Sequence, residues 1–288
     1  MKNHPTLGII GGSGLYEIPD LKKIEKHKIR TPFGEPSSPI MVGTLKGKRL
    51  AFLARHGIGH TLNPSEVNYR ANIYALKTLG VERIVSVSAC GSLREDYVPG
   101  DIVIPDQLFD FTRGRERSFF EGGLVAHIGV ADPFCEDLSP QIHSAVKSTK
   151  AKVHSGGNFI TIEGPRFSTR AESNVYRTWG MDLIGMTTSP EAFLAREAEM
   201  CYGVMAHITD YDVWHISEAP VTADMVFETI KKNTSIAQEA IVNLAANLDN
   251  NMTCNCHNAL AEAFTTQPKN ASSEKRKDLS LLLNKYWK

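Results

Sequence analysis

The chain has 288 residues, enough for one large domain or two small ones. Its 32 Lys and Arg residues balance 32 Asp and Glu residues, so the formal net charge is zero. This balance excludes bulk electrostatic attraction to nucleic acid or to an anionic membrane, because both need an excess of positive charge on the protein. A small neutral or locally captured anionic ligand remains open.

The sequence favours a reducing compartment. The first six residues lead directly into an apolar segment and lack the features of a signal peptide, and apolar runs stay short of membrane-spanning length. Five cysteines, an odd number, are scattered at positions 90, 135, 201, 254 and 256. We therefore expect a cytoplasmic protein.

Apolar, β-branched runs predict strands, and helical periodicity falls between them. The predicted strands are residues 7–10, 39–43, 49–53, 83–87, 101–104, 159–162, 183–186 and 203–208, and the predicted helices are residues 64–77, 168–179, 190–201 and 221–248. This alternation predicts an α/β fold, with a central mixed, mostly parallel β-sheet flanked by helices in a single domain.

The last part of the chain reads differently. Residues 1–250 form the predicted α/β domain, and residues 251–288 form a helical extension packed on it, with helices at 259–264 and 276–287 and a surface loop at 265–275. Near the start of this extension is the pair Cys254 and Cys256, which is either two thiols in a polar turn, a pair that forms a disulfide, or half of a metal site. A metal is the weakest of these readings, because no second pair stands at zinc-finger spacing.

Three small-residue turns follow predicted strands and are suited to bind an anion. The segment Gly-Gly-Ser-Gly at 11–14 exposes backbone N–H groups, Arg55 and His56 supply cationic or polar donors with His60 close behind, and the segment at 87–92 adds Ser88. The first turn alone fits a tight turn equally well, and it lacks the pattern of a dinucleotide or triphosphate loop. A nucleophilic Cys90 is less favoured than a small core residue.

A second group of segments carries carboxylates and small hydroxyl residues. These segments are residues 161–173, 186–191 and 209–212. Asp210 and Asp212 alternate at strand spacing, so they lie on one side if the strand continues through them. They could bind a metal, act as acid and base, or accept from an amino-substituted heterocycle; a metal is disfavoured because no further acidic ligands cluster nearby.

Taken together, these segments resemble the trimeric purine nucleoside phosphorylase family and, within it, the 5′-deoxy-5′-methylthioadenosine phosphorylases. The matching segments are residues 11–14, 31–37, 55–56, 63–69, 89–93, 163–167 and 209–212, so the resemblance spans nearly the whole chain. It implies the nucleoside phosphorylase fold, a homotrimer or dimer of trimers, and attack of inorganic phosphate on C1′ of a purine nucleoside. It also implies that the reaction needs no metal or organic cofactor. Inorganic phosphate is a co-substrate.

The resemblance also implies roles for individual residues. The phosphate ligands would be Ser13, Arg55, His56, Ser88, the backbone of Ala89, and Thr187. The catalytic residues would be Asp210, which stabilises the purine leaving group as N7 takes a proton, and His56. Around the nucleoside, the resemblance implies Met186 under the ribose, Phe167 and Ser168 beside the base, Asp212 near the exocyclic amine, Ala223 and Val226 around the 5′ group, and His127 from a neighbouring subunit.

Two of these positions bear on the base. Family members that act on 6-oxopurines carry Asn at the position of Asp210 and Glu at that of Ser168, so this chain is expected to prefer a 6-aminopurine. The expected reaction is cleavage of 5′-methylthioadenosine to adenine and 5-methylthioribose 1-phosphate. The alternatives are phosphorolysis of methylthioinosine, adenosine or 6-oxopurine nucleosides and, more remotely, a non-catalytic nucleoside-binding or redox-sensing protein.

Overall fold

The computed structural model describes residues 4–215, 222–249, 251 and 253–287. Its strands are β1 (Leu7–Gly11), β2 (Lys22–His27), β3 (Ile40–Leu45), β4 (Lys48–Ala54), β5 (Arg83–Ser92), β6 (Ile102–Ile104), β7 (Gln107–Phe111), β8 (Val153–Ser155), β9 (Asn158–Ile162), β10 (Leu183–Gly185) and β11 (Cys201–Asp210). Its helices are α1 (Tyr69–Thr78), α2 (Leu138–Lys147), α3 (Arg170–Thr178), α4 (Thr188–Glu197), α5 (Ala223–Asn247), α6 (Ser273–Asp278) and α7 (Ser280–Leu283), with short 3-10 turns η1 (Ser13–Tyr16), η2 (Asn255–Asn258) and η3 (Pro268–Asn270).

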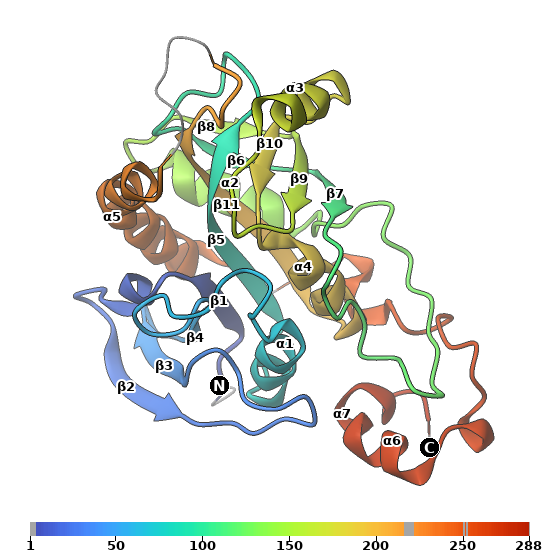
Figure 1. The fold of residues 1–288 in the computed structure, drawn as a ribbon. Helices are drawn as coiled ribbons and strands as arrows, with labels where there is room; N and C mark the ends of the chain where they lie inside the picture. The colour runs from blue at the N-terminus through green and yellow to red at the C-terminus, as the bar shows by residue number, and fades with distance from the viewer. Residues whose placement is uncertain (1–3, 216–221, 250, 252, 288) are drawn as a thin grey trace.

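The strands form one mixed sheet that branches at β5 (Figure 1). The first half of β5 pairs with β1 in parallel, its last residues pair with β10, and its other edge pairs in parallel with β11. Parallel pairs also join β1 to β4, β9 to β10, β7 to β9 and β6 to β8. The prediction of a mixed, mostly parallel sheet flanked by helices is confirmed.

Helices cover both faces of the sheet. One core contains Ile73 and Leu76 of α1 together with Leu194 of α4, and the other contains Ile142 of α2 and Ile241 of α5. Strand β11 is buried along nearly its whole length because it lies between these two layers. A strand covered on both faces needs a continuous apolar sequence, which explains why β5 and β11 could be predicted.

Several elements differ from the prediction. Strand β2 was missed because its sequence is mostly charged and it lies exposed at the sheet edge, where Ile24 is 48% exposed. The half-exposed β7, the short β8 and helix α2 were also missed. The predicted helix at 64–77 begins only at Tyr69, where the side chain of Asn68 caps the first turn.

The C-terminal segment is also less regular than predicted. The helix predicted at 259–264 is wrong: the structure has η2 followed by turns, because six residues are too few to sustain a helix without a cap. The loop predicted at 265–275 contains η3 and the start of α6, and the helix predicted at 276–287 is divided between α6 and α7 at Leu279. Leu279, Leu282 and Leu283 pack into the core that contains α1. The division of the chain after residue 250 stays a prediction.

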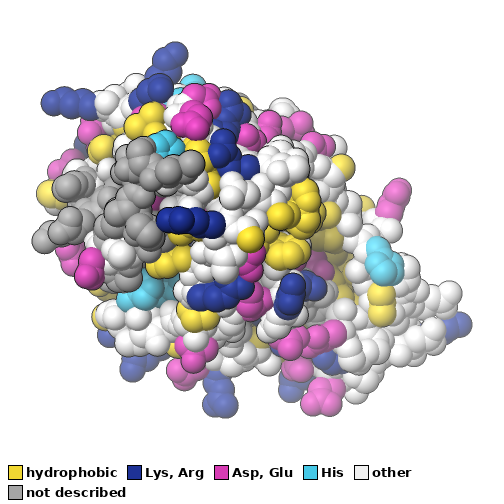
Figure 2. Space-filling view, turned by 45° about the horizontal axis from the view of Figure 1, so that its top comes forward, with side chains coloured by type: hydrophobic (Ala, Val, Ile, Leu, Met, Phe, Trp, Pro, Cys, Tyr) yellow, Lys and Arg dark blue, Asp and Glu magenta, His cyan; other side chains and the backbone are white. Residues whose placement is uncertain are grey.

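Two features of the surface bear on possible partners. Among the described residues, each helix is too short or too polar to cross a membrane. On the face seen in Figure 2, basic and acidic side chains are interspersed.

Candidate active site

The carboxyl ends of four parallel strands bring the predicted anion ligands to one edge of the sheet. Gly11 at the end of β1 lies opposite Ala54 at the end of β4, and the N–H of Arg55 donates to the carbonyl of Gly11 at 2.9 Å. Ser88 and Ala89 lie on β5 just beyond its pairing with β1, and Ser88 lies opposite Ala206 of β11. This edge is where ligands bind in parallel sheets, because the loops that follow the strands converge there.

Arg55 is held by a buried ion pair. Its Nε and Nη2 atoms donate to the two carboxylate oxygens of Glu191, each at 2.8 Å, and the side chains are 3% and 0% exposed. Nη2 also donates to Ser86 Oγ at 2.7 Å, and Ser86 Oγ lies 3.1 Å from Ser88 Oγ. The Glu191 carboxylate, together with its hydrogen bonds, holds the pKa of Arg55 above its ordinary value despite burial. Arg55 is therefore a fixed cation whose orientation Glu191 determines.

His56 lies beside this cation as a neutral imidazole. Its Nδ1 lies 2.9 Å from the carbonyl oxygen of Leu62. A carbonyl can only accept, so Nδ1 carries the proton and Nε2 is left as an acceptor. Burial and the adjacent Arg55 lower the pKa of His56 to about 4, and its ring stacks on that of His60. Nε2 is thus suited to accept the O–H of a phosphate monoanion.

This arrangement predicts a specific tautomer. In ¹⁵N NMR spectra of labelled protein, we expect the His56 ring to remain neutral, with the proton on Nδ1, from pH 8 to about pH 5. A His56→Gln variant assigns the signal, and an imidazolium already formed at pH 6 would contradict the geometry. Since the unfolded chain takes up this proton near pH 6.5 and the folded one only near pH 4, His56 should lower the free energy of unfolding as the pH falls through that window.

Met186 and Thr187 lie in the loop after β10, close to the end of β5. Ile184 of β10 lies opposite Gly91, and Gly185 approaches the carbonyl of Ala89. Thr187 is 7% exposed at the start of α4. Because β10 pairs with β5, the loop delivers both residues to the edge that carries Ser88.

Asp210 and Asp212 follow the same edge at the end of β11. The hydroxyl of Thr209 donates to Asp210 Oδ2 at 2.6 Å, and the N–H of Asp212 donates to Oδ1 at 2.7 Å. The condition for strand alternation is not met, because β11 ends at Asp210 and Asp212 has a left-handed backbone with φ of 51°. The two side chains still begin close together, because a Cβ at Gly91 would lie 2.9 Å from Asp210 Oδ1 and 3.3 Å from Asp212 Cβ.

Burial changes the acidity of both carboxyl groups. It raises the pKa of Asp210, against the opposing hydrogen bonds from Thr209 and Asp212. Burial also raises the pKa of Asp212, and the neighbouring negative charge of Asp210 raises it further. A carboxyl group with a raised pKa exchanges a proton more readily near neutral pH. Of the two residues predicted beside the base, Ser168 is buried and Phe167 is 37% exposed.

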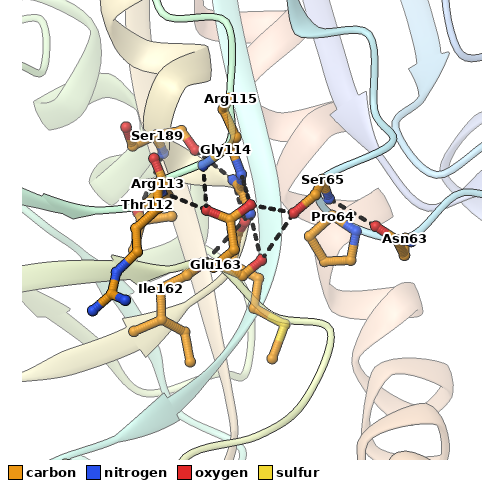
Figure 3. Close-up of polar contacts among 12 residues, drawn as sticks. Asn63, Pro64, Ser65, Thr112, Arg113, Gly114, Arg115, Ile162, Glu163 and Ser189 are labelled. Atoms are coloured by element: carbon orange, nitrogen blue, oxygen red, sulfur yellow. Dashed lines mark hydrogen bonds and ion pairs between the residues drawn. The ribbon is translucent and has the colours of Figure 1, made fainter.

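A network around the buried Arg115 connects these parts, and sequence reasoning missed it (Figure 3). Arg115 donates to the carbonyl oxygens of Met186, Ser189 and Glu163, each at 2.7 Å. The carboxylate of Glu163 accepts from the N–H groups of Arg113 and Gly114 and from the hydroxyl of Ser65. Burial alone would raise the pKa of Glu163, but these hydrogen bonds hold it at about 2.

This network holds Met186 in place. Gly164 has φ of 66°, and a Cβ there would lie 2.6 Å from Met186 Sδ, so only glycine allows this contact. Glu163 belongs to a segment that the sequence analysis singled out, but Arg115 stands in a run of charged residues with no distinguishing pattern. Glu191 likewise belongs to the segment 186–191 named in the sequence analysis, but no role was predicted for it.

For four of the predicted site residues, the described part of the structure shows no contact with the other residues of the site. The side chains of Ser13, Ala223 and Val226 lie outside the described part of the structure, as does residue 221, where α5 was expected to begin. His127 is exposed on the segment between β7 and α2, which runs down to the C-terminal helices in Figure 1, and its N–H donates to the carbonyl of Ala263 at 2.8 Å.

Comparisons with known proteins identify the family of the chain. The family model of the phosphorylase superfamily matches residues 6–248. An S-methyl-5′-thioadenosine phosphorylase of Chloroflexus aurantiacus is 50% identical, with 98% of each chain covered, and one of Geobacter sulfurreducens is 51% identical, with 98% of this chain and 99% of that one covered.

Solved structures show the same relationship. A methylthioadenosine phosphorylase from an antarctic soil metagenomic library superposes with a TM-score of 0.93 at 47% identity, covering 98% of this chain and 100% of that one. A methylthioadenosine phosphorylase of Schistosoma mansoni in complex with adenine has a TM-score of 0.80 at 40% identity, with 84% and 91% covered. The chain belongs to the phosphorylase superfamily and, within it, to the family of S-methyl-5′-thioadenosine phosphorylases. The resemblance stated from sequence is confirmed.

Proposed function

We propose that the chain cleaves 5′-methylthioadenosine with inorganic phosphate, giving adenine and 5-methylthioribose 1-phosphate. The observation that carries this proposal is the placement of two unlike charges at one sheet edge. Arg55 and His56 follow β4, Ser88 lies on β5, and the carboxylate of Asp210 ends β11, the strand that pairs with β5. A phosphate nucleophile and a purine leaving group need such neighbouring sites on either side of C1′.

The chemistry follows from these positions. Donors from Arg55 and Ser88 hold phosphate below C1′, while Nε2 of His56 accepts the O–H of a bound monoanion. As the N-glycosidic bond breaks, the ribosyl group becomes cationic and negative charge builds on the base. Asp210, whose pKa is raised by burial, shares a proton with N7 and so stabilises the base most in the transition state. No metal or organic cofactor is needed for these steps.

The base preference rests on the two carboxylates. Asp212 would accept from the 6-amino group of adenine, whereas a 6-oxo group would face a carboxylate without a proton between them. Ser168 is a small residue at the position where the 6-oxopurine enzymes carry Glu, so it would leave room for this pairing. Adenosine is the second candidate substrate. Ala223 is smaller than the Val that family members commonly carry at this position, which leaves room for another 5′ group. In addition, a solved structure at 39% sequence identity is described as an adenosine/methylthioadenosine phosphorylase.

The assembly and location are also proposals. A homotrimer, or a dimer of trimers, would bring the exposed His127 of one subunit toward the 5′ group in the next. We place the protein in the cytoplasm, where the cysteines would stay reduced.

Product analysis with and without phosphate tests the proposed function. We expect adenine and 5-methylthioribose 1-phosphate from methylthioadenosine only when phosphate is present. Release of free methylthioribose without phosphate would indicate a hydrolase. If methylthioinosine or inosine is cleaved faster than methylthioadenosine, the argument from Asp210 and Asp212 is wrong.

A further inference from the structure

Four buried cysteines meet at one point of the fold, although they are far apart in the sequence. The Sγ atoms of Cys135, Cys201, Cys254 and Cys256 all lie within 4.8 Å of one another. None of the four residues is more than 7% exposed. Each is present as a thiol, as is Cys90, which lies elsewhere in the core. We call these four residues the thiol cluster.

Three separate segments hold the cluster in position. Cys135 precedes α2, and its N–H donates to the carbonyl of Tyr202 at 2.8 Å, next to Cys201 at the start of β11. The Asp137 carboxylate accepts from the N–H groups of Thr253 and Cys254 at 2.6 and 2.8 Å. The backbone around the sulfur atoms is therefore fixed before any ligand binds.

The cluster is separate from the proposed active site. Cys201 begins β11 and Asp210 ends it, nine residues further along the same strand. At roughly 3.3 Å per residue, the two ends are about 30 Å apart. A ligand at the cluster would therefore act on stability and not on the reacting atoms.

We propose that the thiol cluster binds one zinc ion in a closed, tetrahedral, structural site. A Zn–S bond of about 2.3 Å in tetrahedral geometry separates the sulfur atoms by roughly 3.8 Å. The Sγ atoms of Cys201 and Cys254 are 3.4 Å apart, and the limit of 4.8 Å holds for every pair in the cluster. The four sulfur atoms are thus gathered around a single point, and one ion uses all of them.

Ligand chemistry and the surroundings favour zinc. Four thiolates select a soft or borderline metal, and their close spacing suits one ion rather than a multi-iron cluster. On binding Zn²⁺, the four thiols release four protons and the site gains a net charge of about −2. The N–H of Leu138, at the start of α2, donates to Cys135 Sγ at 3.4 Å and offsets part of that charge.

The zinc ion would tie the segment after α5 to the sheet. Cys254 and Cys256 lie on that segment, whereas Cys135 precedes α2 and Cys201 is the first residue of β11. The sequence left half of a metal site as the weakest interpretation of Cys254 and Cys256, and spacing could not reveal the other two ligands because the four are spread over positions 135 to 256. The expectation that phosphorolysis needs no metal is unaffected.

Metal analysis of the full-length protein tests this proposal. After purification without a metal-affinity tag and under reducing conditions, we expect about one zinc ion per chain by elemental mass spectrometry. Cobalt exchanged into the site should give the visible bands of tetrahedral thiolate coordination. A Cys254→Ser/Cys256→Ser variant should lose at least nine-tenths of the zinc, while the matched control Cys90→Ser, a buried cysteine outside the cluster, should keep it.

Thiol counting on wild-type protein keeps the test independent of whether the variant folds. When the protein is alkylated in denaturant with a chelator and no reductant, we expect five modified cysteines. In a separate measurement, removal of zinc from the folded protein should lower its melting temperature. Protein that neither contains nor takes up zinc or cobalt when reduced would overturn the proposal. So would metal-free protein with fewer than five alkylated cysteines, since it would show that the cluster forms disulfides. Phosphorolysis is measured separately, so either result leaves the proposed function to its own test.

Discussion

Replacing Asp210 by Asn is expected to lower kcat/KM for methylthioadenosine by about 10²- to 10⁴-fold, the usual contribution of a positioned proton donor. The side chains have nearly the same shape, and the amide oxygen can still accept from the N–H of Asp212. An amide, however, cannot share a proton with N7 as the base leaves. The measurement is steady-state phosphorolysis at saturating phosphate, with thermal unfolding as a check on the fold.

Asp20→Asn is the matched control for this substitution. Asp20 is exposed, and its carboxylate pairs with Lys46 at 3.0 Å on the surface. We expect its kcat/KM to equal that of the wild type. If a folded Asp210→Asn variant also retains full turnover, Asp210 has no part in activating the leaving group.

Glu191→Gln is expected to destabilise the protein by about 3–5 kcal/mol, because it leaves the charge of Arg55 buried without a counter-charge. The Glu191 carboxylate accepts from Arg55 through both oxygens and from the hydroxyl of Tyr202 at 2.8 Å. The amide of Gln offers only one oxygen to these donors and points an N–H at another. We also expect KM for phosphate to rise, because Arg55 is no longer held in one orientation.

Glu25→Gln provides the comparison for the ion pair. Glu25 also binds an arginine through two oxygens, Arg49, but its side chain is 50% exposed. A pair in water contributes less than about 1 kcal/mol, so the melting temperature should hardly change. Equal destabilisation by the two substitutions would contradict the importance assigned to the buried pair. A Glu191→Gln variant with unchanged KM for phosphate would show that Arg55 does not depend on Glu191 for its position.

Local patterns in the sequence were sufficient for the central part of the fold. Strands β5 and β11 are covered on both faces, so their sequences had to be continuously apolar and could be identified. The edge strand β2 left no such pattern, because its side chains face water. The helix expected at 259–264 failed for a related reason: an apolar stretch of one or two turns can pack equally well as irregular backbone.

The candidate site divides in the same way. The sequence alone determined which side chains follow the strands, and the family resemblance implied that Arg55, His56 and Ser88 bind phosphate while Asp210 acts on the base. Only the tertiary structure decided the states of these groups. The partner Glu191 and the burial that lowers the pKa of His56 come from segments distant in the sequence. The thiol cluster is the clearest case, since cysteines from three segments become neighbours only when α2, β11 and the chain after α5 pack together.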